Sequence, residues 1–256
     1  MKKVAFTIIA IAFATLFTAC KNETQETPTT VQNQDLAVAD ITPASTTSYL
    51  YVTASSGLTL REFNNLNSEK LAVMPYGTKL EVLSEEANNT MTVGGISGGM
   101  HEVAYNNKTG YAFNGFLSKF FPPEKDTNAK IYVNDLKATF PSASFIETTG
   151  GTASKPTNTQ TILLPTDKWH EAFYIAQKLY DIPSVFQFPN PKGKDVEVIK
   201  NAKKPEQLQT SNLAIERKNN ALQTITYTQA AEGFGTNITI SQEAAFMKIE
   251  YTTVVE

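Results

Sequence analysis

Short alternations of apolar and polar residues dominate residues 48–123 of the sequence. Leu58 and Leu60 alternate with polar neighbours, and Leu80 and Val82 alternate with charged ones. This period of two is typical of strands with one buried face. Glycine and proline turns separate the segments, so the pattern predicts a small β-barrel of short strands.

A helical stripe follows in the C-terminal half. Thr166 is a candidate N-cap, and the Asp-Ile-Pro segment 181–183 predicts the end of the helix because a residue before proline disfavours helical backbone. The apolar residues between them fall at i, i+3, i+4, i+7, i+10 and i+11, which is one buried face. They are Trp169, Ala172, Phe173, Ala176, Leu179 and Tyr180.

The remaining strand candidates predict an antiparallel sheet on which this helix packs. The last three alternate clearly and predict a meander, which with one main helix makes an α+β domain over residues 129–256. The polar, glycine-containing segment 148–157 is expected to be a loop. The strand candidates are residues 137–146, 161–164, 184–188, 196–199, 222–228, 236–241 and 246–255.

The N-terminus has the pattern of a processed signal. Two lysines precede an apolar run at residues 4–17, which is too short for a confident transmembrane helix and indicates a secretory signal peptide over residues 1–19. Cys20, the only cysteine, follows Leu-Phe-Thr-Ala and resembles the lipidated cysteine of a lipobox. An ordinary signal peptide with an unrelated cysteine is the alternative.

Residues 20–47 are rich in Thr, Gln, Asn, Asp and Pro, and such a composition predicts a disordered tether. Lipidation at Cys20 would attach the chain to a lipid bilayer through acyl chains. The Lys-Asn-Glu segment after Cys20 resembles surface-export signals of Bacteroidetes lipoproteins. The expected location is therefore the outer membrane, on its periplasmic or its external side.

The net charge of the chain limits the classes of partner that it can bind. The formal net charge is -3 and the isoelectric point is about 5.6. A mildly acidic chain without a basic stripe argues against a nucleic-acid partner.

Several motifs in residues 48–123 occur in the order of the bacterial SH3-like domain. They are Gly57-Leu58-Thr59-Leu60-Arg61, Gly77-Thr78-Lys79-Leu80, Met100-His101-Glu102-Val103 and Lys108-Thr109-Gly110-Tyr111. The pattern departs at Met100, where the family usually has Trp, and at Thr59, where it has Asn. The resemblance covers roughly a quarter of the chain. The whole is similar to Bacteroidetes-type lipoproteins that join such a domain to an uncharacterised C-terminal one.

This resemblance implies a ligand groove lined by aromatic residues, with peptidoglycan peptides or an envelope protein as partner. By motif position the candidates are Tyr51, Arg61, Phe63, Tyr76, Tyr111 and Phe113. The alternative is that Tyr76 and Tyr111 are core residues. Arg61 is suited to binding a peptide carboxylate through two hydrogen bonds, or to a salt bridge with a turn carboxylate.

Four glycines at positions 94, 95, 98 and 99 surround Ile96 and indicate tight turns or close backbone approach, with a hairpin extension as the simpler interpretation.

Catalytic patterns are sparse. Cys20 is the only thiol, no Gly-x-Ser-x-Gly turn stands between a predicted strand and a predicted helix as a nucleophile elbow requires, and His101 and His170 fall in different predicted domains. We expect no metal site and no cofactor, and His170 and Glu171 are expected on a solvated helix flank. The sequence therefore favours a non-catalytic binding or scaffold module. A cell-wall hydrolase with an unrecognised C-terminal site and a structural subunit of an outer-membrane complex remain alternatives.

Overall fold

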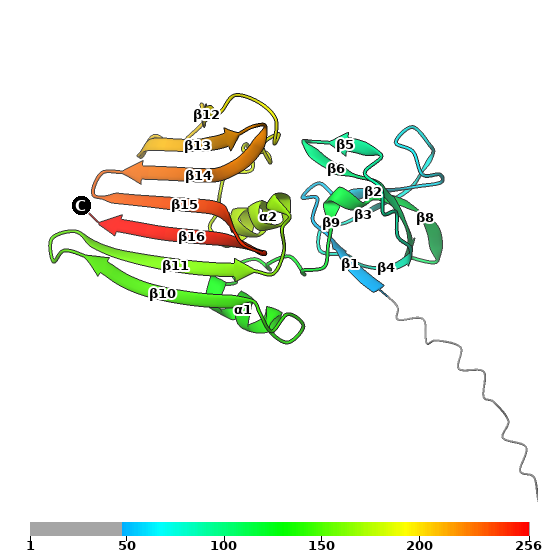
Figure 1. Ribbon diagram of the computed structural model, residues 1–256, viewed down its shortest axis with the longest axis horizontal. Helices are drawn as coiled ribbons and strands as arrows, with labels where there is room; N and C mark the ends of the chain where they lie inside the picture. Colours follow the sequence, from blue (N-terminus) through cyan, green and yellow to red (C-terminus); the bar gives the residue numbers. More distant parts are fainter. Residues whose placement is uncertain (1–47, 256) are drawn as a thin grey trace, which may run out of the picture. The chain divides into compact units, whose positions relative to one another are not determined.

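Two seven-stranded antiparallel sheets dominate the computed structural model (Figure 1). The structure describes residues 48–255, and these belong to one compact unit. The predicted signal peptide (1–19), Cys20 and the predicted tether (20–47) lie outside the described residues. The prediction of a mostly β chain is confirmed.

The first sheet has the order β3-β2-β8-β7-β4-β1-β9. Its edges, β3 and β9, are not paired with each other, so the region has the expected short strands but is not a closed barrel. The strands are β1 (Ser48–Val52), β2 (Leu58–Arg61), β3 (Lys70–Met74), β4 (Lys79–Ser84), β7 (Met100–Tyr105), β8 (Lys108–Phe113) and β9 (Leu117–Ser118). A separate hairpin of β5 (Met91–Val93) and β6 (Ile96–Gly98) and a 3-10 turn, η1 (Asn114–Phe116), complete the region.

Alternating burial explains why these segments form strands. In β4, Leu80 and Val82 are buried while their charged neighbours are exposed, and in β2 the buried residues are Leu58 and Leu60. With Val103 of β7 they form a core on one face of the sheet. The predicted period of two is therefore confirmed in both strands.

The second sheet has the order β10-β11-β16-β15-β14-β13-β12, so that β12 to β16 form a continuous meander. Its buried face carries one row of side chains that are directly opposite in the strand register: Phe145, Ile162, Ile249, Ile240, Ile225 and Ile215. The strands are β10 (Ser144–Gly151), β11 (Pro156–Leu164), β12 (Val196–Lys200), β13 (Leu208–Lys218), β14 (Ala221–Ala231), β15 (Phe234–Glu243) and β16 (Phe246–Val255).

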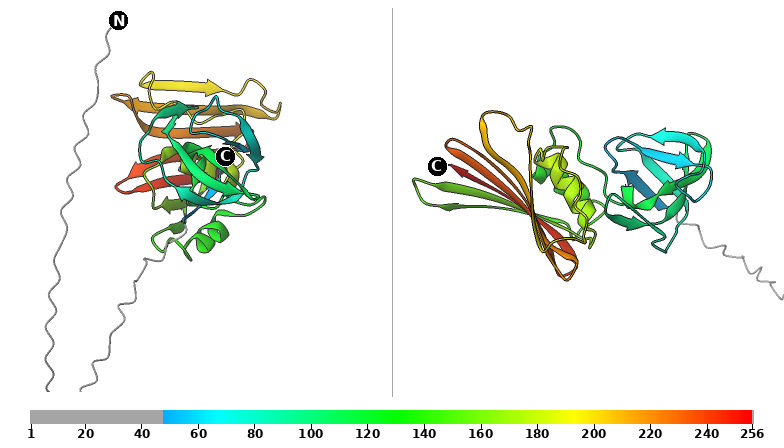
Figure 2. Two further views of the ribbon diagram at one scale, coloured as in Figure 1. Left: turned by 90° about the vertical axis from the view of Figure 1, so that its right-hand side faces the viewer. Right: turned by 90° about the horizontal axis from the view of Figure 1, so that it is seen from above.

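Two helices pack on this sheet (Figure 2). The predicted helix is α2 (Trp169–Leu179), which lies against β15 and β16, and its chain direction changes at Asp181, whose φ is +52°. The second helix, α1 (Ala129–Leu136), lies against β10 and β11 and was not predicted. Asn128 caps α1, because its Oδ1 accepts a hydrogen bond of 2.9 Å from the Ile131 N–H.

Several other details of the predicted secondary structure are wrong. The N-cap of α2 is Lys168 and not Thr166. The strand expected over 137–146 begins only at position 144, and residues 184–188 form no strand. Segment 148–157 is mostly the end of the β10–β11 hairpin instead of a loop. Strand β13 was not predicted at all, although it contributes buried Leu213 and Ile215 to the core.

Candidate ligand-binding site

A cleft of about 790 Å³ lies between the first sheet and the C-terminal end of α2. Its first wall consists of residues 54–59, Arg61 of β2, and the turn between β5 and β6. Its second wall comes from the end of α2 and the segment that follows it up to Asn190. Clefts of this size are typical of sites that enclose small ligands.

Aromatic side chains from both regions form the floor of the cleft. Met100 and Phe113 are 5% and 3% exposed, and the Phe113 and Phe116 rings meet edge to face at 5.6 Å between centroids. Phe116 in turn lies 6.4 Å from the ring of Tyr174 on α2. Burial raises the pKa of Tyr174 to about 12, so its hydroxyl stays neutral at physiological pH and is able to donate a hydrogen bond.

Arg61 provides the positive charge of the first wall. It ends β2, opposite Tyr111 of β8, and its Nη1 donates a hydrogen bond of 2.9 Å to the Ser68 carbonyl. This bond fixes one side of the guanidinium, and its other N–H groups have no partner among residues 48–255. A guanidinium held in this way is suited to a carboxylate with two acceptor oxygens.

The β5–β6 turn closes the cleft against the C-terminal region. Gly94 and Gly95 have φ angles of +56° and +79°, which a two-residue hairpin turn requires. A Cβ added to Gly95 would lie 2.9 Å from the Cα of Asn190. The hairpin extension expected from the paired glycines is therefore confirmed, and Gly95 also lies close to the backbone of Asn190.

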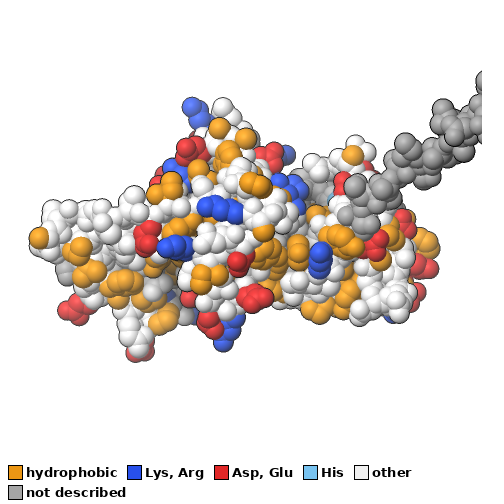
Figure 3. Space-filling model, turned by 90° about the horizontal axis from the view of Figure 1, so that it is seen from below, with side chains coloured by type: hydrophobic (Ala, Val, Ile, Leu, Met, Phe, Trp, Pro, Cys, Tyr) orange, Lys and Arg blue, Asp and Glu red, His pale blue; other side chains and the backbone are white. Residues whose placement is uncertain are grey.

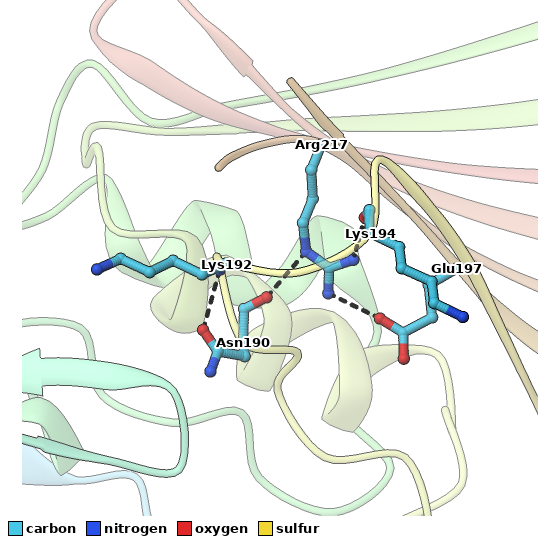
Figure 4. Close-up of polar contacts among 5 residues, drawn as sticks. All are labelled: Asn190, Lys192, Lys194, Glu197 and Arg217. Atoms are coloured by element: carbon cyan, nitrogen blue, oxygen red, sulfur yellow. Dashed lines mark hydrogen bonds and ion pairs between the residues drawn. The ribbon is translucent and has the colours of Figure 1, made fainter. Parts of the chain in front are cut away.

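The backbone of Asn190 is held in turn by Arg217, a buried side chain of β13 (Figure 4). Its Nε donates to the Asn190 carbonyl at 3.0 Å and its Nη1 to the Lys194 carbonyl at 2.9 Å. Its Nη2 pairs with Glu197 at 3.0 Å. Arg217 thus fixes the loop that forms one end of the cleft, a role that sequence reasoning missed because it depends on contacts distant in sequence.

The six predicted ligand residues do not share one groove. Arg61 and Phe113 line the cleft described above, and Tyr111 is half-buried on the strand next to Arg61. Phe63 lies in the loop after β2 and is 56% exposed. Phe113 also belongs to the hydrophobic core, so its position in the floor does not depend on a ligand.

Tyr51 and Tyr76 line a second cleft, of about 970 Å³, together with Phe121. The Tyr51 and Phe121 rings meet edge to face at 6.3 Å. The Lys178 ammonium lies 4.8 Å from the centre of the Tyr76 ring, and burial raises the pKa of Tyr76 to about 12. The aromatic candidates are therefore distributed over two clefts, and Lys178 and Asp181 line both.

The two histidines, which fall in different predicted domains, line one cavity of about 390 Å³. His101 Nδ1 accepts a hydrogen bond of 2.9 Å from the Glu86 N–H, and burial lowers the pKa of His101. His170 Nε2 is buried without a hydrogen-bond partner, and burial lowers the pKa of His170 to about 4. Both imidazoles are therefore neutral at pH 7.

The expectation of a solvated flank at Glu171 is wrong, because this residue is 2% exposed. Ser118 Oγ of β9 donates to its Oε1 at 2.8 Å, and Thr166 Oγ1 donates to its Oε2. Thr166 also accepts a hydrogen bond from the Lys168 N–H, at 3.2 Å, just before α2. The Glu171 carboxylate thus joins the first sheet to α2.

Metal-binding groups, membrane-spanning helices and the surface charge also bear on what the chain can bind. Within residues 48–255, no group of three or more His, Cys, Asp and Glu side chains is placed to hold a metal ion. No helix in the same range is long and apolar enough to cross a membrane. On the face shown in Figure 3, charges of both signs are scattered among uncharged and hydrophobic side chains.

Comparison with known proteins gives one match. No curated protein and no solved structure matches the chain. Residues 56–118, which include β2 with Arg61 and the floor residues Phe113 and Phe116, match the family described as bacterial SH3 domain. This segment of the chain is therefore similar to bacterial SH3 domains.

Proposed function

We propose that the protein is a lipid-anchored, non-catalytic binding or scaffold module of the cell envelope that recognises peptidoglycan or a peptide through its SH3 domain. The observation that carries this proposal is the cleft containing Arg61, whose floor is aromatic and whose first wall lies mostly within the domain. Apolar floors with a few placed polar groups are typical of ligand sites.

The chemistry of the cleft fits peptide carboxylates. The Arg61 guanidinium is a planar cation with several N–H donors, and it is held by the Ser68 carbonyl. Peptidoglycan stem peptides carry free carboxylates and present them in a short, extended chain. A hydrogen bond between charged groups contributes about 1.5 to 3 kcal/mol, so loss of the Arg61 contact should weaken binding by about tenfold or more.

Binding is tested by co-sedimentation of the mature chain with purified peptidoglycan. We expect the wild type to sediment and Arg61→Gln to bind about tenfold more weakly, because the charged pair is lost. Lys70→Gln is the matched control, since Lys70 lies opposite Arg61 in the strand register, is exposed and does not line the cleft. If the wild type stays in the supernatant, peptidoglycan is not the ligand, and a stoichiometric envelope protein that co-purifies would favour the scaffold role.

Anchoring is a separate part of the proposal and is supported by the lipobox-like sequence before Cys20. We expect the full chain to incorporate labelled palmitate and to require detergent for extraction from membranes. Cys20→Ser should abolish labelling and release the protein. A Cys20→Ser protein that stays in the membrane fraction would contradict lipidation.

The shared cavity of His101 and His170 is the one observation that favours the hydrolase alternative. Its groups are already engaged: His101 Nδ1 accepts from a backbone N–H, and both Glu171 oxygens accept from hydroxyls. This arrangement supports a structural role for the cavity. Release of soluble fragments from peptidoglycan by the wild type, together with loss of that release in His170→Gln, would show that the protein is an enzyme.

A further inference from the structure

The C-terminal region supplies much of the cleft, although the family match ends at residue 118. Ten of the 24 residues that line the cleft come from α2 and the segment after it. Among them are Tyr174 in the floor and Asp181 at the rim. The SH3 domain alone therefore presents an incomplete site.

Asp181 is the negative charge of this second wall. The helix α2 ends at Leu179, and the positive φ of Asp181, +52°, turns the chain away from the helix axis. Aspartate tolerates this left-handed conformation better than most residues. Its side chain is exposed and forms no ion pair with any residue between 48 and 255.

Lys178, one turn earlier, lines the same cleft but is engaged elsewhere. Its ammonium lies over the ring of Tyr76, which belongs to the second cleft. The carboxylate of Asp181 is therefore left for a cation from outside, and the guanidinium of Arg61 on the first wall is left for an anion. Within the described part of the chain, the two walls of one cleft thus carry charges of opposite sign that form no ion pair.

We infer that the site is composite and binds a short zwitterionic peptide, with its free carboxylate on Arg61 and a free amino group on Asp181. This inference rests on the proposed function and assigns a role to the C-terminal region. Tyr174 and Phe116, whose rings meet across the two regions at 6.4 Å, form an apolar surface for the body of the peptide. A cleft of about 790 Å³ is suited to a ligand of a few residues.

The test is calorimetric titration of the mature chain with a peptidoglycan stem tetrapeptide in three forms: unmodified, with its carboxylates amidated, and with its amino groups acetylated. We expect each modification to weaken binding by about tenfold, the value of one charge-assisted hydrogen bond. Asp181→Asn should weaken binding of the unmodified peptide by the same factor and leave binding of the acetylated peptide unchanged. Arg61→Gln should likewise weaken binding of the unmodified peptide by about tenfold and leave binding of the amidated peptide unchanged.

Asp126→Asn is the matched control for the second wall. Asp126 is exposed, has a φ of +65° and lines the second cleft, which Asp181 also borders, but it does not line the first cleft; the substitution therefore removes a similar charge from outside the proposed site. If Asp181→Asn binds all three peptides like the wild type while Arg61→Gln is impaired, the composite site is wrong and the proposed function stands. If the wild type binds neither the tetrapeptide nor intact peptidoglycan, both are wrong.

Discussion

Replacement of His170 by phenylalanine should remove most of the acid sensitivity of folding. The His170 Nε2 is buried without a partner, and burial lowers the pKa of His170 from 6.5 to about 4. The unfolded chain therefore takes up a proton at a higher pH than the folded chain, so this group makes the protein less stable as pH falls from about 6.5 towards 4. Lys168 adds to the lowering of the pKa and Asp167 opposes it.

The magnitude follows from linkage between protonation and folding. With pKa values of 6.5 unfolded and about 4 folded, the free energy of unfolding should fall by about 2 kcal/mol between pH 7 and pH 5. His170→Phe should lose little over this range, because phenylalanine does not titrate. At pH 7 the variant should be about 1 kcal/mol more stable than the wild type, since the unpaired buried nitrogen is removed.

The assay is urea unfolding at pH 7, 6 and 5, followed by circular dichroism and by the fluorescence of Trp169, the only tryptophan. His101→Asn is the comparison variant, because it removes the other histidine while His170 remains. Burial also lowers the pKa of His101, so some pH dependence should survive in His170→Phe. A wild type and a His170→Phe variant that lose the same stability between pH 7 and pH 5 would refute this reasoning.

Three further substitutions test contacts that hold the cleft together. Gly95→Ala places a Cβ 2.9 Å from the Asn190 backbone at a residue with a φ of +79°, and thermal unfolding should show a loss of about 2 kcal/mol. Arg217→Met leaves the Asn190 and Lys194 carbonyls without their donor; we expect a loss of about 2 to 4 kcal/mol in urea unfolding and faster hydrogen exchange in the 190–195 loop. Ser118→Ala removes a buried donor to a carboxylate and should lower the free energy of unfolding by about 1.5 to 3 kcal/mol, whereas Ser118→Thr should retain part of it.

The sequence predicted best where burial alternates without interruption. The meander strands β14, β15 and β16 were predicted because their inward residues are almost all large and apolar. Strand β13 was missed because its inward row begins with Ser211 and ends with Arg217, two polar residues that are buried by specific hydrogen bonds. A pattern of apolar residues does not reveal polar groups that are buried with their partners.

Helix α1 was missed for a different reason. Its buried residues, Ala129, Tyr132, Val133 and Leu136, have the i, i+3, i+4, i+7 spacing of a helix, and Asn128 before them is a good N-cap. The information was present, but one aromatic residue flanked by two β-branched ones, Ile131 and Val133, favours strand on propensity.

Only the part of the candidate site that belongs to the SH3-like motifs was predictable from the sequence. Arg61 and Phe113 were identified because they belong to motifs of the SH3-like family, and both line the cleft. Asp181 was recognised only as part of a helix end, since its position beside the cleft depends on contacts between segments far apart in sequence. The same holds for the cavity shared by His101 and His170.

The strand order of the second sheet has a consequence for how the chain folds. Strands β12 to β16 each pair with a sequence neighbour, so these pairings close only short loops. The pairing of β11 with β16, as between Leu164 and Met247, joins segments on the order of 90 residues apart and has a larger entropic barrier. The meander is thus expected to form early in folding, and the β10–β11 hairpin, with α1, to add late. Substitutions at Ile162 should then mainly accelerate unfolding, whereas those at Ile225 should slow folding.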